Sequence, residues 1–206
     1  MTLAFDPMNI IISGVGGQGN ILASDLISRA FCADDYFVSV GETYGATQRG
    51  GSVFSHVRLS QKHLYGPLIP MGEGHVIIGF EPLEAYRSLL DYGHEHIRVV
   101  MNDRPFYPLD TLRKHSLYPD LQKLISNITK LSAELKIIKG TELASTAGHP
   151  QTQNVVMVGG LAGLNWLPLE KKKYIAAIEE IFSNAKLELN IKAFELGFQA
   201  GMKSQT

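Results

Sequence analysis

A strand that runs through a glycine loop into a helix is the feature that most limits how this chain can fold. Residues 9–13, centred on three consecutive isoleucines, are predicted to form a buried strand. The hexapeptide Gly14-Val15-Gly16-Gly17-Gln18-Gly19 follows, and apolar residues at helical spacing then continue from Ile21 to Phe31. A short second strand is predicted over 36–40. This order is typical of a Rossmann-like first βαβ unit.

The glycine loop satisfies the pattern G-x-G-x-x-G between a strand and a helix. Glycines allow a tight turn and a close approach of a ligand to the backbone, and free N–H groups at a helix start favour an anion. A dinucleotide fold also has an acidic residue roughly 20 positions further on, where Glu42 comes slightly late. A phosphate or carboxylate site, a nicotinamide or flavin site, and a purely structural role all remain open.

A second polar loop spans residues 42–52 and follows the second predicted strand. We expect it at the same edge of the sheet as the glycine loop. Arg49 offers a planar fork for a phosphate or carboxylate, and Gly50-Gly51 exposes backbone donors beside it. The alternative is an ordinary turn with a solvated arginine.

The remaining segments predict a three-layer αβα sandwich with a mostly parallel, mixed central sheet in a single domain over 1–206. Residues 52–59 alternate with period two and follow no helix, so this strand is predicted to be antiparallel to a neighbour. Further strands are predicted at 75–80, 97–101 and 135–138. Helical segments are predicted at 81–90, 117–131, 141–147 and 154–167, from Pro168 onward, and finally around Ile191 to Phe198.

The predicted helix over 154–167 contains Gly159, Gly160 and Gly163. Each glycine inside a helix costs about 1 kcal/mol relative to alanine. Several together predict that the helix backbone packs closely against another element.

Composition and charge argue against two broad classes of function. The formal net charge is -1, and the one basic run, Lys171-Lys172-Lys173, is expected to be the solvated face of a helix, so we expect no nucleic-acid partner. No apolar run approaches the roughly 18 residues of a membrane span, and residues 1–9 lack the pattern of a secretion signal. We therefore expect no membrane association and a cytoplasmic location.

The chain has a single cysteine, Cys32, which we expect to be a small core residue beside Phe31. One thiol cannot hold an iron–sulfur cluster or form a Cys-x-x-Cys redox pair. His94-Glu95-His96 resembles a metal pair but lacks a third ligand, so we expect no metal site there. His56 is predicted to be a hydrogen-bonded structural histidine. For Tyr44 and Tyr65, lining a pocket and simple aromatic packing are both open.

Several stretches together resemble the γ subunit or domain of 2-oxoacid:ferredoxin oxidoreductases. They are the glycine loop at 14–19 and Thr-Gln-Arg-Gly-Gly-Ser-Val-x-Ser-His-Val-Arg at 47–58, supported by the segments at 65–70, 154–159 and 190–197. The resemblance therefore spans nearly the whole chain. The family includes enzymes for indolepyruvate, 2-oxoglutarate, 2-oxoisovalerate and pyruvate.

The resemblance implies an accessory subunit that is inactive alone and has no catalytic residue of its own. Family members decarboxylate a 2-oxoacid oxidatively, using thiamine diphosphate and iron–sulfur clusters, and usually transfer the acyl group to coenzyme A. The chain lacks the Gly-Asp-Gly…Asn-Asn thiamine motif and cluster cysteines, so both cofactors are expected on partner α, β and ferredoxin-like δ subunits, with electrons passing to ferredoxin. Self-association of the isolated chain is a further expectation.

We expect no tightly bound cofactor on this chain, and coenzyme A at a subunit interface. Its binding residues are predicted to be Gly14, Gly16, Gly17, Gln18, Gly19, Gln48, Arg49, Gly50, Gly51 and Ser52. The alternatives are that these loops are assembly elements only, or that the chain is a free-standing NAD(P)- or flavin-dependent oxidoreductase.

Overall fold

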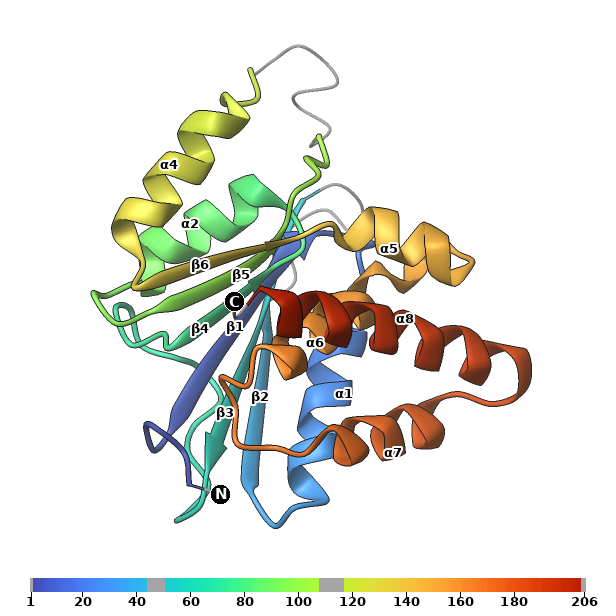
Figure 1. Ribbon diagram of the computed structural model, residues 1–206. Coiled ribbons are helices and arrows are strands. Elements are labelled where there is room, and N and C mark those ends of the chain that lie inside the picture. Colours follow the sequence, from blue (N-terminus) through green and yellow to red (C-terminus); the bar gives the residue numbers. More distant parts are fainter. Residues whose placement is uncertain (1, 44–50, 108–116, 205–206) are drawn as a thin grey trace.

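The computed structural model describes residues 2–43, 51–107 and 117–204 and shows a six-stranded sheet between two layers of helices (Figure 1). The strands are β1 Met8–Val15, β2 Phe37–Thr43, β3 Ser52–Ser60, β4 Val76–Gly79, β5 Arg98–Asn102 and β6 Glu134–Ile138. The helices are α1 Asn20–Cys32, α2 Pro82–Tyr92, α4 Leu121–Leu131, α5 Gly140–Ala147, α6 Gln153–Gly163, α7 Lys171–Ile181 and α8 Asn184–Lys203, with a short 3-10 turn η1 Pro150–Thr152.

The sheet is mixed, in the order β2-β3-β1-β4-β5-β6. Strands β1, β4, β5 and β6 are parallel, and β3 is antiparallel to both of its neighbours. The three-layer sandwich and the antiparallel third strand are confirmed. The first βαβ unit is split, however, because β3 lies between β1 and β2 and separates the two strands that a Rossmann unit pairs directly.

Alternate residues of β1 supply the two halves of the core. Ile10 and Ile12 belong to the cluster beneath α1, α6, α7 and α8, whereas Ile11 belongs to the cluster beneath α2 and α4. Successive strand side chains point to opposite faces of the sheet. A strand covered on both faces reads as a continuous apolar run, which explains the three isoleucines.

Helices α6 and α8 pack backbone against backbone, as the helical glycines predict. A Cβ atom on Gly159 would overlap the carbonyl oxygen of Phe194, and one on Gly197 would overlap that of Val156. The same relation links Gly163 with Phe198 and Gly201 with Gly160. Glycines on both helices are therefore required by proximity.

A loop replaces a helix over the face of β2 and β3 that is opposite α1. Arg58 donates to the carbonyl oxygens of Gly66 (2.9 Å) and Leu68 (3.1 Å) and lies over the Tyr65 ring. Buried His56 accepts from the Ile69 N–H at 3.0 Å through Nδ1, and burial lowers the pKa of its imidazole. The structural role predicted for His56 is confirmed, and Tyr65 packs on an arginine in this arrangement.

Cys32 is exposed, so the prediction that it is a core residue is wrong. It is the last residue of α1, and Phe31 takes the buried position one residue earlier. A step of one residue turns the next side chain about 100° around the helix. The pattern of apolar residues could not fix the side on which this last residue falls.

The helix boundaries differ from prediction where local signals were missed. Helix α4 begins at Leu121 because the carboxylate of Asp120 accepts from the Lys123 N–H at 2.9 Å and caps it. Helix α6 ends at Gly163, and Asn165 then adopts a left-handed conformation with φ 59°. Among the described residues, no helix combines the length and apolar character that crossing a bilayer requires.

Candidate functional site

The topology creates a crevice at the carboxyl ends of β1 and β4. These two strands are parallel neighbours, but α1 follows β1 onto one face of the sheet while α2 follows β4 onto the other (Figure 1). At such a switch point the connecting loops diverge and leave room for a ligand. The glycine loop lies at this point.

The glycine loop is shaped by two left-handed residues. Gly17 has φ +102°, and Gly19, which caps α1, has φ +87°. A side chain at Gly19 would also overlap Asn154, whose amide donates to the Gly19 carbonyl at 3.3 Å. No side chain caps α1, so the first N–H groups of the helix keep their donor capacity.

Several groups of the glycine loop form hydrogen bonds within the protein. Gln18 accepts from the Val15 N–H at 2.7 Å, and its own side-chain amide donates to the Phe80 carbonyl at 3.4 Å. The N–H of Gly16 donates to the carbonyl oxygen of Gly51 at 2.8 Å. Within the described part of the chain, the N–H groups of Gly17 and Gly19 have no such acceptor.

Of the second polar loop, residues 42–43 and 51–52 are described. Gln48, Arg49 and Gly50 lie outside the described residues. Gly51 contacts Gly16 through the bond above, and the Ser52 hydroxyl donates to the carboxylate of Glu84, which Arg87 also engages at 2.7 Å. The described end of this loop therefore lies against the glycine loop, and Ser52 is bound internally.

A cavity of about 470 Å³ opens beside the glycine loop. Gly17 and Gln18 form one wall, and residues after β5, β6 and α5 form the others: Arg104, Phe106, Tyr107, Thr141, Gln151 and Gln153. Arg104 is exposed, and its guanidinium has no ion pair or hydrogen bond to any other described residue. A cation and the free N–H group of Gly17 thus line one space.

Side-chain amides form the floor of this crevice. The Phe80 carbonyl accepts from Gln153 (2.9 Å), Asn102 (3.3 Å) and Gln18 (3.4 Å). The amide oxygens of Asn102 and Gln153 accept in turn from the N–H and the hydroxyl of Thr141, at 3.2 and 3.1 Å. The amide oxygens of Asn102 and Gln153 are therefore used inside the protein, whereas the Gly17 N–H and the Arg104 guanidinium are left as donors for a ligand.

A buried carboxyl group borders the crevice after β4. Glu81 has no exposed surface and accepts from the Glu84 N–H at 2.8 Å and from the Tyr118 hydroxyl. Burial raises the pKa of Glu81, and the bond from Tyr118 opposes that rise. The carboxyl group caps α2 and ties Tyr118 to the sheet edge, which is a structural task.

The family model for pyruvate ferredoxin/flavodoxin oxidoreductase matches residues 9–200. The chain belongs to this family. It is 34% identical over 196 residues to indolepyruvate oxidoreductase subunit IorB of Methanothermobacter thermautotrophicus, covering 95% of this chain and 98% of that one. It is 24% identical over 196 residues to 2-oxoglutarate synthase subunit KorC of Archaeoglobus fulgidus, covering 95% and 89%.

Solved structures show the same fold. The γ subunit of a keto/oxoacid ferredoxin oxidoreductase from Geobacter sulfurreducens matches with a TM-score of 0.67 and 22% identity, over 95% of this chain and 99% of that one. The 2-oxoglutarate:ferredoxin oxidoreductase of Magnetococcus marinus, solved with 2-oxoglutarate, coenzyme A and succinyl-CoA, matches with a TM-score of 0.75 and 22% identity. There the match covers 97% of this chain but 32% of the other. By family and fold, the chain is a small subunit of a 2-oxoacid:ferredoxin oxidoreductase complex.

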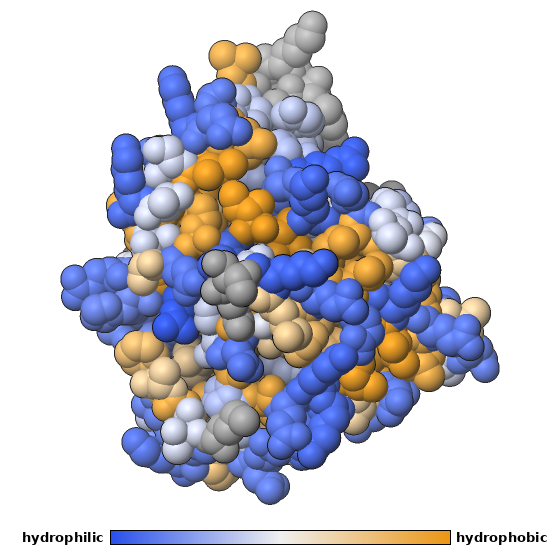
Figure 2. Space-filling model, viewed as in Figure 1, coloured by the Kyte–Doolittle hydropathy of each residue, from blue (hydrophilic) through white to orange (hydrophobic). Residues whose placement is uncertain are grey.

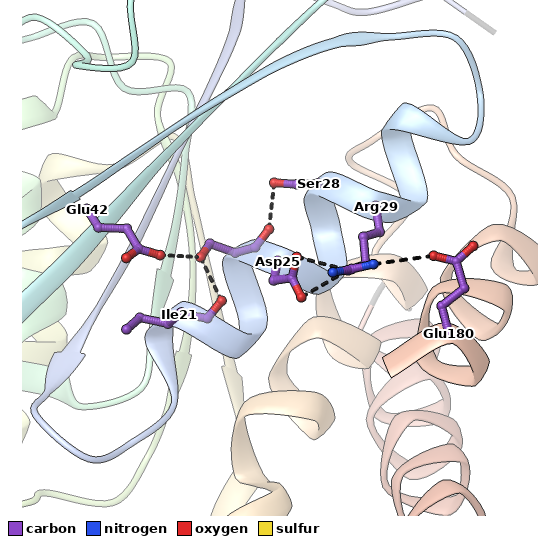
Figure 3. Close-up of polar contacts among 7 residues, drawn as sticks. Ile21, Asp25, Ser28, Arg29, Glu42 and Glu180 are labelled. Atoms are coloured by element: carbon purple, nitrogen blue, oxygen red, sulfur yellow. Dashed lines mark hydrogen bonds and ion pairs between the residues drawn. The ribbon is translucent and has the colours of Figure 1, made fainter. Parts of the chain in front are cut away.

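In this family member, Glu42 does not line the 470 Å³ cavity but, together with Gly19, a separate cavity of about 560 Å³ along α1. It lies near the end of β2, which β3 separates from β1. Figure 3 shows its carboxylate directed toward α1, where it accepts from the Ser24 hydroxyl at 3.5 Å; Asp25 and Arg29 follow along the helix. The split βαβ unit therefore weakens the dinucleotide hypothesis, which needs adjacent strands.

The described residues contain no group of three or more histidine, cysteine or acidic side chains able to hold a metal ion. His94 and His96 have ring centroids 5.9 Å apart, and His96 pairs with its neighbour Glu95 at 3.4 Å.

Tyr44 lies outside the described residues. The basic run at 171–173 opens α7, and its lysines pair with Glu195, Glu170 and Asp34.

Sequence reasoning missed most of the cavity wall. Arg104 comes two residues after β5, and residues that follow parallel strands at the same edge are candidates for a site. The position of Arg104 shortly after a predicted strand could therefore have marked it as a candidate site residue. The position of Thr141 and Gln153 depends on how α5 and α6 return to the sheet, which no local pattern reports.

Proposed function

We propose that this chain is the small subunit of an indolepyruvate-type 2-oxoacid:ferredoxin oxidoreductase. The observation that carries the proposal is near-full-length identity of 33–34% to four IorB subunits. Identity to KorC subunits is lower, at 24% and 26%. The complex would convert arylpyruvates to acyl-coenzyme A thioesters and pass the electrons to ferredoxin.

We infer that partner subunits hold the thiamine diphosphate and the iron–sulfur clusters. The single cysteine of this chain cannot supply the four thiolates of a cluster. The chain then acts through its contacts, and we expect no turnover by the isolated polypeptide.

We further propose that the crevice beside the glycine loop receives a phosphate group of coenzyme A. The free donors of Gly17 and Arg104 favour a ligand that offers acceptors. The amide oxygens of Asn102 and Gln153 beside them are already used by the protein. Gln48, Arg49 and Gly50 remain part of this prediction.

An exposed apolar strip supports the presence of partner chains. Figure 2 shows apolar surface where the edge strand β6 and helix α4 lie in this view. Ile137 on β6 and Leu131 on α4 are 39% and 47% exposed. Exposed apolar surface beside an unpaired sheet edge is typical of a protein interface.

Co-purification tests the assembly. A tagged chain expressed in its native cell should retain thiamine-binding and ferredoxin-like chains, and the purified complex should oxidise indolepyruvate with higher kcat/KM than 2-oxoglutarate. Turnover by the tagged chain alone, or a preference for 2-oxoglutarate, would contradict the proposal.

The KM for coenzyme A tests the crevice. In the assembled complex, Arg49→Ala and Arg104→Gln should each raise this KM by about tenfold, the effect expected for one charged hydrogen bond. The matched control is Arg29→Gln on α1, whose guanidinium pairs with Asp25 and Glu180. The KM of the control should not change.

A purely structural role is the second candidate, and specific contacts favour it. Gly16 binds Gly51, and Ser52 binds Glu84, so part of both loops is satisfied internally. If Arg49→Ala and Arg104→Gln abolish assembly and leave the KM of residual complex unchanged, the loops are interface elements.

A further inference from the structure

A second cavity, of about 260 Å³, lies at the opposite ends of the strands from the glycine loop. Its wall includes Met8 and Arg98, which begin β1 and β5, and His75, which immediately precedes β4. Phe5 and Trp166 complete an apolar and aromatic lining. The volume is below the roughly 300–1,000 Å³ of sites for drug-sized ligands, so it suits a ligand of one or two rings.

The aromatic wall is ordered by stacking and burial. The Phe5 ring stacks on His75 with centroids 4.1 Å apart and an interplanar angle of 16°. Trp166 is only 9% exposed. Flat ring faces held in place offer a large contact area for another planar ring.

The same wall carries N–H donors that lack protein acceptors. His75 accepts from the Asn9 N–H at 2.9 Å through Nδ1, so the proton of its neutral ring is on Nε2. Burial, followed by the charges of His94 and Arg58, lowers the pKa of His75 to about 4, which keeps the ring neutral at neutral pH. Within the described part of the chain, neither His75 Nε2 nor the Trp166 indole nitrogen donates a hydrogen bond.

Arg98 supplies a positive charge at this cavity. Its ion pair with Glu134 is long, at 3.8 Å, and uses Nε. Its guanidinium carbon lies 5.7 Å from the centroid of the Trp166 ring. The terminal nitrogens therefore keep the paired N–H groups that bind a carboxylate in a bidentate manner.

We propose that this cavity binds a small aromatic carboxylate, with its ring against the Phe5, His75 and Trp166 side chains and its carboxylate on Arg98. The ring of the ligand would pack on the aromatic lining, and its carboxylate would accept hydrogen bonds from the donors of the cavity that have no acceptor in the described protein. The inference depends on the cavity alone and does not depend on the proposed activity.

Trp166 is the only tryptophan in the chain, so its fluorescence reports on this cavity directly. The full-length chain is titrated with phenylacetate, with phenylacetamide, which keeps the ring without the charge, and with acetate, which keeps the charge without the ring. Phenylacetate should change the emission saturably, and the other two should bind at least about tenfold more weakly, or about 1.4 kcal/mol.

A matched pair of variants locates the carboxylate. Arg98→Gln should weaken phenylacetate binding by about tenfold or more. Arg29→Gln should leave it unchanged, although the two side chains are almost equally exposed, at 47% and 46%, and both form ion pairs. Circular dichroism and thermal unfolding of each variant confirm folding.

The proposal is overturned if phenylacetate gives no saturable change, if phenylacetamide binds as tightly as the acid, or if the two arginine variants behave alike. The ligand series uses the unmodified chain and remains decisive even if Arg98→Gln does not fold. No turnover is measured, so a negative result here leaves the proposed activity untouched.

Discussion

Two regions of this molecule require glycine for opposite reasons. In the glycine loop, Gly17 has a positive φ, and apart from its chain neighbours no described residue has an atom within 4 Å of the place that a Cβ would take, so the backbone angle demands glycine. In the α6–α8 contact, Gly159 and Gly197 lie in regular helices, and the neighbouring backbone leaves no room for a Cβ. The conformation of the first region leaves N–H groups available, and the second region brings two helix backbones into direct contact.

A side chain added in the glycine loop would strain the local backbone, whereas one added in the α6–α8 contact would disturb the packing of two helices. A left-handed angle costs an ordinary residue about 1–2 kcal/mol, and that cost stays within the loop. An overlap between two helix backbones cannot be relieved by a rotamer change, because both helices must move. The loss in the free energy of unfolding on substitution by alanine should therefore differ between the two regions.

Gly197→Ala is expected to have the largest effect. Its Cβ would lie 2.8 Å from the Val156 carbonyl carbon and 3.0 Å from the Gly160 nitrogen, so α8 must separate from α6. We expect a loss of more than about 4 kcal/mol, a large share of the roughly 5–15 kcal/mol that stabilises a typical domain. Urea unfolding followed by circular dichroism measures it, and a loss below about 1 kcal/mol would show that the helices are not in backbone contact.

Gly19→Ala combines both costs and should come second, at about 2–4 kcal/mol. The new methyl group has a strained φ and also displaces the buried Asn154 side chain. The double variant Gly19→Ala/Asn154→Ala removes the obstacle, so its loss should be smaller than the sum of the two single losses. Strict additivity would show that only the backbone angle matters at this position.

Gly17→Ala should cost about 1–2 kcal/mol through strain alone. Because Gly17 lines the 470 Å³ cavity, a methyl group there should also raise the KM for coenzyme A of the assembled complex while kcat stays the same. Thermal unfolding and steady-state kinetics separate the two effects. An unchanged KM would argue against phosphate binding at this loop.

Gly66→Ala should have almost no effect, within about 0.5 kcal/mol. Gly66 has no positive φ, and apart from its chain neighbours no described residue has an atom within 4 Å of the space that a methyl group would fill. It is the reference for the series. A large loss here would mean that the ranking does not follow from angle and proximity.

Hydrophobic periodicity was sufficient to predict the strands and most helices of this fold. The alternation at 52–59 correctly predicted a strand, the absence of a preceding helix correctly predicted that it is antiparallel, and the glycines at 159–163 correctly predicted a close backbone contact. The position of β3 between β1 and β2 was not predictable, because pairing is decided by side chains from three distant segments. The partner glycines Gly197 and Gly201 also had no local signal, since each is one small residue in an ordinary amphipathic helix.

The site was less predictable than the fold. The glycine loop was recognisable because its motif is contiguous in sequence. The amide floor was not, because its centre is the backbone carbonyl of Phe80, which any residue at that position would provide. The aromatic cavity at the other edge joins residues from 4 to 166, and only the folded sheet brings them together.

The loop that Arg58 fixes beneath the sheet has a consequence for association. Leu64, Leu68 and Met71 are 61–78% exposed on it, yet the backbone on either side of Leu68 is held by Arg58 and His56. Ordering a mobile segment is a main entropic cost of forming an interface. The backbone around Leu68 is already fixed by these hydrogen bonds, so burying the Leu68 side chain would require little further loss of backbone freedom.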